Sequence, residues 1–370
     1  MSINWMLLLS LVIMVPVVLT TTVIPLLTRK IESFGVTIPE EAQNHPVIES
    51  LRGKYVWWNG GAGTILTLSL LICSLYISGE KTWGALLVSH VVGYMILSFV
   101  IYYKQHQAVK SLKERERWLK DAPQRIIVST RFRSGKLTQP NYWFIPHILL
   151  ILATVLVGVI GYDRLPDQIP MKYGLDGEVT RAVAKSYRSV LWPAFVQSFL
   201  LVVFVFTNAV IGRSKQVAEP GDPEGSLLRN MKFRQIWSSY LIAFGFMIMA
   251  TLGLIPVGML YGWSGNVAAV ATIAVVGIMT LASIVLSVKT GQGGSRIKLD
   301  KENTAKQYAS AADQDRYWKL GQFYYNPDDP SYFVEKRFGI GWTINHARPG
   351  VWVIFAILIL LIVLLPFILE

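Results

Sequence analysis

Residues 266–288 read NVAAVATIAVVGIMTLASIVLSV, a run without a single Lys, Arg, Asp or Glu. An α-helix rises about 1.5 Å per residue, so about 20 apolar residues are needed to cross the roughly 30 Å hydrocarbon core of a bilayer. The run meets that length, and its composition therefore predicts a transmembrane helix.

Seven other apolar runs have this length or nearly so. They cover residues 3–27, 56–77, 83–103, 144–160, 190–212, 240–261 and 351–369. All 35 Lys and Arg residues and all 23 Asp and Glu residues lie outside the eight runs. An unpaired ion in hydrocarbon costs at least about 2.5 kcal/mol, so complete exclusion of charge is typical of spanning helices. A large soluble helical core, the alternative, rarely keeps such long runs free of charge.

The overall composition supports the same fold class. Of 370 residues, 52% are hydrophobic and 16% are charged, with a mean hydropathy of +0.43. Soluble domains usually carry about 25% charged residues. We therefore predict an all-α integral membrane protein, a polytopic helical bundle of about eight transmembrane helices with small cytoplasmic and extracellular caps.

The distribution of basic residues between the loops predicts the orientation. Loops one, three, five and seven together carry 29 Lys and Arg residues, whereas the other loops carry 6. Basic loops tend to stay in the cytoplasm, so eight spans place both termini on the extracellular side of the cell membrane. The net charge of +12 then reflects basic residues near anionic lipid. We expect the lipid bilayer as a partner and no nucleic acid.

The first run is expected to be an anchor and not a cleaved signal peptide. No basic residue precedes it, it is too long for a signal peptide, and Arg29 and Lys30 follow it. The only cysteine, Cys73, lies inside the second run, which excludes an intrachain disulfide and a cluster of metal-binding thiolates. We expect no cofactor and no metal.

The polar residues inside the runs are hydroxyls, amides and two histidines, His90 and His147. Ion-coupled transport usually needs buried carboxylates or basic groups, so their absence from the runs disfavours a driven transporter. No HExxH zinc motif and no nucleophile–base pair is visible, and the chain is not predicted to be an enzyme. Both histidines are expected to have structural roles, with His90 able to pair with a hydroxyl.

The chain divides into five segments. These are a three-span module with a basic cytoplasmic loop (1–143), the fourth and fifth spans (144–212), the region up to the end of the seventh span (213–288), an aromatic-rich cytoplasmic segment (289–350) and the eighth span (351–370). We call residues 162–189, between the fourth and fifth spans, the outer cap, and residues 289–350 the inner cap. No internal repeat indicates inverted-repeat transporter symmetry.

The outer cap combines turn-forming residues with acidic side chains. Two interpretations are open: the carboxylates bind a divalent ion or a cationic peptide, or they form a series of Asx turns, which is the simpler one. The candidate binding residues are Asp163, Asp167, Lys172, Tyr173, Asp176 and Glu178.

The inner cap is too aromatic for a disordered linker, and we expect it to fold against the membrane or the other inner loops. Asp328 and Asp329 fit either a cation site or an ordinary turn. Residues 291–295 lack the ending of a phosphate-binding loop and are expected to form a flexible exit from the seventh span. The candidate binding residues are Trp318, Tyr325, Asn326, Asp328, Asp329, Lys336, Arg337 and Asn345.

Two stretches resemble known bacterial families. Leu165-Pro166-Asp167-Gln168-Ile169-Pro170, then Gly177 and Lys185-Ser186, is similar to domain of unknown function 1648, which precedes the SdpI fold in immunity proteins against a secreted toxin. The family pattern has a His where this chain has Lys172, so any metal or proton chemistry of that His is not carried over.

The second resemblance lies in residues 318–345. The runs Phe-Tyr-Tyr-Asn-Pro-Asp-Asp-Pro and Lys-Arg-Phe-Gly-Ile-Gly-Trp-Thr-Ile-Asn resemble domain of unknown function 5808, which ends many such multi-span proteins. Together the two resemblances imply a plasma-membrane protein of a Gram-positive bacterium.

These observations lead to two functional hypotheses. The first is a non-catalytic plasma-membrane protein of the sensor or immunity type, whose caps bind a peptide, an envelope component or a membrane-protein partner. The alternative is a transporter or lipid-handling protein with a hydroxyl-lined path, which predicts a polar cavity at mid-membrane. The sequence leaves the oligomeric state open.

Overall fold

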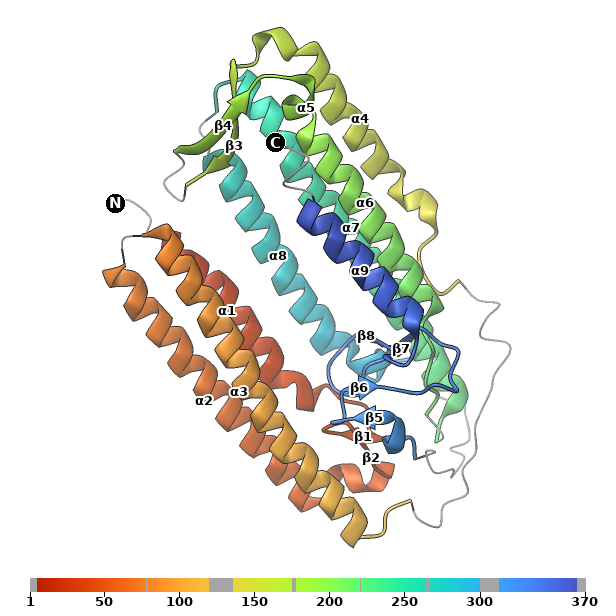
Figure 1. Ribbon diagram of the computed structural model, residues 1–370. Helices are drawn as coiled ribbons and strands as arrows, with labels where there is room; N and C mark the ends of the chain where they lie inside the picture. Colours follow the sequence, from red (N-terminus) through yellow and green to blue (C-terminus); the bar gives the residue numbers. More distant parts are fainter. Residues whose placement is uncertain are drawn as a thin grey trace.

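The computed structural model describes residues 5–77, 79–119, 136–174, 178–219, 221–263, 266–299 and 313–364. Its long elements are helices that run side by side (Figure 1). They are α1 (Trp5–Val23), α2 (Pro46–Tyr76), α3 (Glu80–Arg115), α4 (Ile145–Ile160), α5 (Tyr187–Val190), α6 (Trp192–Arg213), α7 (Pro223–Leu260), α8 (Asn266–Thr290) and α9 (Pro349–Leu364). The predicted all-α helical bundle is confirmed.

Seven helices among the described residues are long and apolar enough to cross a membrane. The eighth apolar run forms α9, of which 16 residues are described. That length is just below the range of about 17–25 residues for a spanning helix, and the predicted end of this span, residues 365–369, lies outside the described residues. The chain is a multi-pass membrane protein.

Helices α2, α3 and α7 continue far beyond their apolar runs, toward the side that the basic loops assign to the cytoplasm. We call this side the inner end of the bundle. The charged segment after the third run extends α3 to Arg115, as its helical spacing predicts. Helix α7 starts at Pro223, where Asp222 accepts a hydrogen bond from the Gly225 backbone N–H at 2.9 Å. A proline suits the first helical position because the N–H that it lacks has no partner there.

The helices form two groups joined by α8. Helices α1, α2 and α3 pack on one another, and α4, α6 and α7 form the second group. Helix α8 contacts both α7 and α1 and lies between the groups (Figure 1). Helix α1 begins at the outer end and α9 runs toward that end, consistent with the prediction that both termini lie on one side (Figure 1).

Amide and hydroxyl side chains join the helices of the first group. Asn59 on α2 donates to the Tyr94 hydroxyl on α3 at 2.8 Å and to the Thr22 hydroxyl on α1 at 3.1 Å. Buried polar groups need partners, and neutral ones cost less than charges in hydrocarbon. His90 lies 3.4 Å from the Ser69 hydroxyl, which confirms the predicted pairing.

Large apolar side chains point outward along the spans. Ile65 on α2 is 69% exposed and Ile160 on α4 is 79% exposed. Water would penalise a continuous apolar surface of this kind, whereas hydrocarbon does not. The outward-facing side chains of the two helix groups therefore match a lipid environment.

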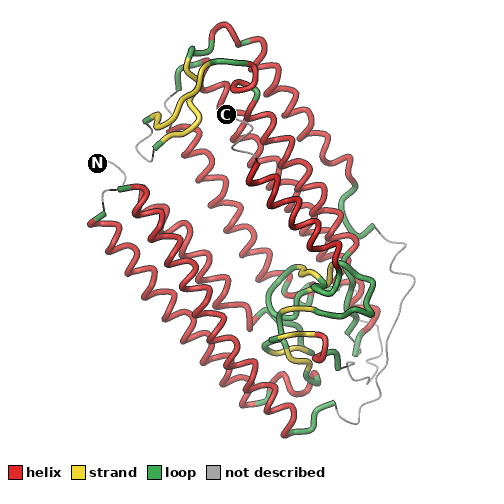
Figure 2. The backbone as a smooth tube through the Cα atoms, viewed as in Figure 1, coloured by secondary structure: helices red, strands yellow, loops and turns green. Residues whose placement is uncertain are grey.

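The strands of the described residues are short and are confined to the two ends of the bundle (Figure 2). They form four antiparallel pairs: β1 (Glu32–Ser33) with β2 (Val36–Thr37), β3 (Gln168–Tyr173) with β4 (Val179–Ala184), β5 (Trp318–Lys319) with β6 (Phe323–Tyr324), and β7 (Phe333–Glu335) with β8 (Trp342–Ile344). The β3–β4 pair, which we call the outer hairpin, lies at the outer end. The other three pairs lie together at the inner end.

Helices α1 and α2 approach closely at Gly63. A Cβ there would lie 2.5 Å from Val18 Cγ1 and 3.0 Å from the Tyr94 ring, whereas a Cβ at Gly61 would meet nothing within 4 Å. We expect Gly63→Ala to reduce the free energy of unfolding by about 1–3 kcal/mol, because the stiff Val18 side chain must move. The measurement is the thermal unfolding temperature in detergent.

Gly61→Ala is the matched control. It should leave the unfolding temperature unchanged or raise it slightly, because alanine forms helix better than glycine. Equal losses for the two variants would contradict the close contact between α1 and α2.

Candidate functional site: the inner cap and the outer hairpin

A buried carboxylate lies at the centre of the inner end. Glu335 on β7 is 3% exposed and accepts hydrogen bonds from Arg29, which follows α1, and from Asn230 and Arg234 on α7. The Arg234–Glu335 distance is 3.1 Å, and Arg234 is fully buried. One side chain of the inner cap therefore binds both helix groups.

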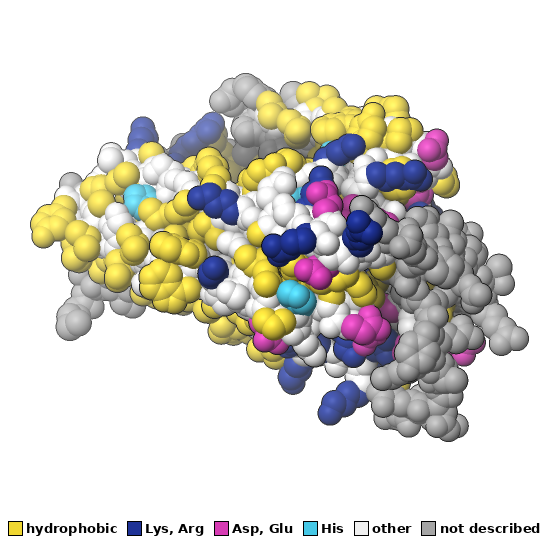
Figure 3. All heavy atoms as spheres, turned by 90° about the horizontal axis from the view of Figure 1, so that it is seen from below, with side chains coloured by type: hydrophobic (Ala, Val, Ile, Leu, Met, Phe, Trp, Pro, Cys, Tyr) yellow, Lys and Arg dark blue, Asp and Glu magenta, His cyan; other side chains and the backbone are white. Residues whose placement is uncertain are grey.

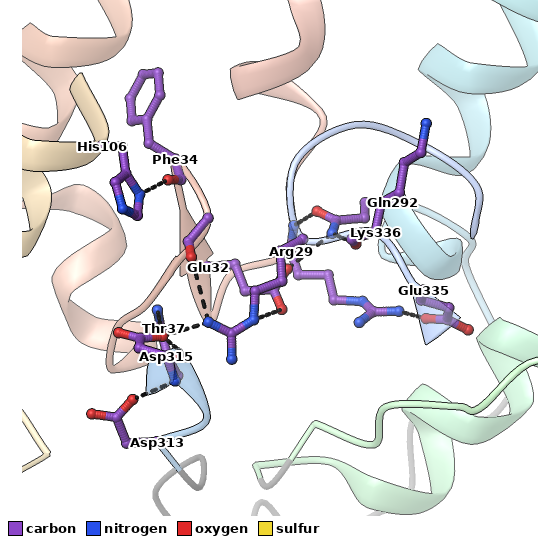
Figure 4. Close-up of polar contacts among 12 residues, drawn as sticks. Arg29, Glu32, Phe34, Thr37, His106, Gln292, Asp313, Asp315, Glu335 and Lys336 are labelled. Atoms are coloured by element: carbon purple, nitrogen blue, oxygen red, sulfur yellow. Dashed lines mark hydrogen bonds and ion pairs between the residues drawn. The ribbon is translucent and has the colours of Figure 1, made fainter. Parts of the chain in front are cut away.

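The remaining donors and acceptors of this cluster are also paired. Arg234 donates to the Asn230 side-chain oxygen at 2.7 Å and to the Ile211 carbonyl at 2.6 Å. Gln292 donates to Glu32 at 2.9 Å, so the turn after α8 joins the cluster (Figure 4). Burial raises the pKa of Glu32, while the nearby Arg29 and Arg337 oppose that rise.

A second ion-pair cluster connects the inner cap to α3. Asp315 accepts hydrogen bonds from Lys113 at 2.6 Å, from the Thr37 backbone N–H at 3.0 Å and from Arg337. Burial alone would raise the pKa of Asp315, but Arg337 and Lys113 outweigh it and lower the pKa to about 2. Lys113 also binds Asp313 at 2.8 Å. On the surface of this end, too, acidic and basic side chains lie near one another (Figure 3).

Three of the predicted inner-cap binding residues hold the cap together. Asn345 is fully buried and donates to the carbonyls of Asn326 and Asp329 at 2.9 and 3.1 Å. Asp329 binds Lys215 at 2.6 Å and the Tyr324 hydroxyl at 2.7 Å. Burial alone would raise the pKa of Asp329, but its hydrogen bonds, that from Lys215 first, lower it to about 2. The turn interpretation of this segment therefore fits better than a cation site.

The other predicted inner-cap residues divide between buried and exposed positions. Trp318 is buried, and the Arg337 guanidinium lies over its ring at 5.2 Å. Tyr325 and Asp328 are exposed at the surface. Lys336 follows Glu335, and its side chain extends away from the ion pairs toward α8 (Figure 4). It has no hydrogen-bond or ion-pair partner for its ammonium group within the described part of the chain.

The predicted flexible exit from the seventh span is instead a packed turn. Gln292 is 1% exposed, and its backbone N–H donates to the Leu27 carbonyl at 2.9 Å. Gly294 has a φ of +89°, and a Cβ there would lie 2.5 Å from the Arg229 carbonyl oxygen. The glycines of this loop permit close packing against α7 and the end of α1. The sequence of the loop matches no recognised motif, so it does not predict this packing.

A cavity of about 350 Å³ lies between the inner cap and the helices. Its wall includes Thr20 and Ile24 near the end of α1, Phe99 on α3, Ser287 on α8, and Lys336. The transporter alternative predicts a polar cavity at mid-membrane. This cavity lies instead at the inner end, where the spans meet the inner cap, and its wall is largely apolar.

The predicted outer-cap residues do not converge on one site. Asp163 and Asp167 lie near the base of the outer hairpin, while Lys172, Tyr173 and Glu178 lie near its tip. Burial raises the pKa of Tyr173. Asp176 lies outside the described residues. No group of three or more His, Cys, Asp or Glu side chains that could hold a metal occurs in the part of the chain that is described.

Hydrogen bonds and apolar contacts hold the base of the outer hairpin on the helix ends. Lys185 donates to the Leu165 carbonyl at 2.9 Å and lies 3.4 Å from Asp167. Leu165 and Ile169 are buried beside Val190. Ser186 caps α5 by accepting a hydrogen bond from the Ser189 backbone N–H. The Leu-Pro-x-x-Ile-Pro and Lys-Ser residues therefore position the hairpin.

Family comparisons match two parts of the chain. The domain of unknown function DUF1648 matches residues 149–196, from α4 through the outer hairpin to the start of α6. The family of unknown function DUF5808 matches residues 327–352 at the inner end. The chain carries both domains. No curated protein and no solved structure matches the chain. Both predicted resemblances are confirmed.

The sequence did not single out the residues that bind the DUF5808 segment to the bundle. In the sequence, Arg29 and Arg234 are only basic residues that help set the orientation, and Glu335 lies between the two runs that carry the DUF5808 resemblance. One signal was available, because Asn230 and Arg234 lie four residues apart and so share one face of a helix. Their common partner is distant in the sequence, and spacing alone cannot identify it.

Loss of the Glu335 carboxylate should destabilise the protein strongly. Glu335→Gln leaves Arg29 and Arg234 buried without their counter-ion, and breaking a buried pair typically costs about 3–5 kcal/mol. The measurement is thermal unfolding in detergent. Glu40→Gln, which breaks the exposed pair with Lys30, is the matched control and should cost no more than about 1 kcal/mol. Similar losses for both variants would contradict the central role of Glu335.

The two depressed aspartate pKa values predict how the inner cap responds to acid. A carboxyl with a pKa of about 2 when folded and about 3.9 when unfolded stabilises the folded state fully above pH 4. That contribution is lost as the pH falls from about 4 to 2. We expect the unfolding temperature to drop over this interval, and Asp315→Asn to lower it already at pH 6.

Asp328→Asn is the control for this experiment, because Asp328 is exposed and its carboxylate forms no ion pair with any described residue. It should follow the unaltered protein at every pH. An Asp315→Asn profile identical to that of the unaltered protein would contradict the role assigned to Asp315.

Proposed function

We propose that the chain is a non-catalytic plasma-membrane protein of the sensor or immunity type, whose outer hairpin binds an extended peptide or envelope component. The observation that supports this proposal is the exposed strand β4 (Val179–Ala184), in which every residue except Val183 is exposed. The match to DUF1648 covers this hairpin, and the sequence resemblance to that domain implies a link to immunity proteins.

The geometry of the hairpin favours recognition through the backbone. One face packs on the helix ends, where Ile169, Met171 and Val183 lie near Met259 and Leu260. The sheet has two strands, and no third strand pairs with it among the described residues. An exposed strand edge can bind an extended peptide by adding it as a further strand.

The inner cap supports a role in holding the bundle and presenting a surface to a partner. Its ion pairs are mostly internal, so they do not provide free charges for recognition. Leu320 and Tyr325 are 43% and 47% exposed and are the kind of side chain that contacts a cytoplasmic or membrane partner. This second contact belongs to the same proposal.

The experiment is a selection of displayed peptides on the full chain in lipid nanodiscs. We expect retained peptides to be lost when residues 163–178 are replaced by a neutral Gly/Ser linker of equal length, because the hairpin tip and strand β3 are then removed. Thr180→Pro, a smaller change in β4, should weaken retention by tenfold or more by interrupting the strand.

Replacement of the exposed Lys319 by Gln on the inner cap is the control and should leave retention unchanged. The unfolding temperature of every variant must be measured in parallel to show that the bundle remains folded. If a folded linker variant retains the same peptides as the unaltered chain, the outer hairpin is not the binding element.

A further inference from the structure

The cavity at the inner end contains one cation and no anion among its described wall residues. Lys336 contributes the cation, and the rest of the wall is apolar, aromatic, hydroxyl or amide. Its side chain extends away from the ion-pair clusters and toward the span of α8 (Figure 4). Lys336 is exposed at the surface, and no carboxylate pairs with its ammonium group among the described residues. A bound anion would accept a charge-assisted hydrogen bond from this ammonium group.

The backbone on both sides of Lys336 is held in place. The preceding residue, Glu335, is held in the buried ion-pair cluster. Two residues later, Phe338 packs against Tyr102 with ring centroids 4.3 Å apart. Gly339 and Gly341 have φ values of +99° and +103°, which residues other than glycine rarely adopt. The Lys336 backbone N–H donates to the Gly341 carbonyl at 3.0 Å. These contacts fix the backbone of Lys336 beside the cavity that its side chain lines.

The other walls of the cavity match an amphipathic molecule. Thr20, Ser98 and Ser287 present hydroxyl groups. Met95, Phe99 and Ile284 form apolar parts of the wall, and Met95 is 50% exposed. The cavity therefore opens on an apolar surface of the bundle, which faces hydrocarbon, and not only toward water.

The position of the cavity corresponds to the depth of lipid headgroups. It lies where α1 and α8 end and where the basic inner loops begin. Arg296 is exposed at the same seam and donates to the carbonyls of Leu26 and Val288, at 2.8 and 3.1 Å. Basic residues at this depth attract anionic lipids. A volume of about 350 Å³ is at the small end of ligand pockets, enough for a headgroup whose chains continue outside.

We propose that this cavity binds the phosphate group of an anionic membrane lipid, with Lys336 as its counter-ion and the apolar wall of α3 and α8 against its acyl chains. Inorganic phosphate carries the same anionic group as the lipid headgroup and is the competing ligand for this site. The apolar wall favours the lipid, because free phosphate gains nothing from it. The site lies at the opposite end of the bundle from the outer hairpin, so the two proposals can fail independently.

The experiment measures lipid-dependent stabilisation of the purified full chain in detergent. Phosphatidylglycerol, phosphatidylcholine and inorganic phosphate are titrated separately while the unfolding temperature is recorded. We expect phosphatidylglycerol to raise that temperature in a saturable way. Lys336→Gln should weaken its apparent affinity by tenfold or more, because a charge-assisted hydrogen bond is lost. Lys336→Arg should retain most of the affinity.

Lys319→Gln is the matched control, because Lys319 is an exposed inner-cap lysine that does not line the cavity. Without added lipid, Lys336→Gln should unfold at the same temperature as the unaltered chain or higher, which separates ligand binding from a structural role. The proposal is overturned if phosphatidylcholine or inorganic phosphate stabilises equally well. It is also overturned if Lys336→Gln responds to phosphatidylglycerol like the unaltered chain.

Discussion

The buried carboxylate of Glu335, held between Arg29 and Arg234, is the interaction on which the inner half of the structure depends. Each guanidinium comes from a different helix group, and the carboxylate comes from the inner cap. Removing these charges from water is costly, so they are stable only while all three are present and hydrogen-bonded. The cluster therefore makes the assembly of the two groups conditional on the docking of the DUF5808 segment.

The exclusion of charge from the spans determines where recognition can occur. Within the helices, neutral groups such as Asn59 and His90 join neighbouring helices through hydrogen bonds with hydroxyl groups. Charged chemistry is left for the ends of the bundle. At the outer end it surrounds an exposed hairpin, and at the inner end Glu335, Asp315 and Asp329 are engaged in internal ion pairs. Lys336 differs from the basic partners of these carboxylates because it lines a cavity.

The sequence predicted the fold class well because spanning helices are specified locally, by twenty or so adjacent apolar residues. It also identified the segments that match DUF1648 and DUF5808. It could not show that Asn326, Asp329 and Asn345 stabilise the inner cap, because a polar residue in a turn has the same local pattern whether it is buried or free. The Glu335 cluster cannot be predicted from the sequence for a related reason. Its members are distant in the sequence, and basic residues next to spans are already expected from the orientation of the protein in the membrane.

The separation between Arg29 and Glu335 has a consequence for biogenesis. These partners lie 306 residues apart, so Arg29 emerges from the ribosome long before its counter-ion is made. Until then the arginine must remain hydrated or beside lipid phosphates, and the first three helices cannot be locked to the rest. Membrane insertion and final assembly are thus distinct stages for this chain, with the second delayed until the DUF5808 segment has been synthesised.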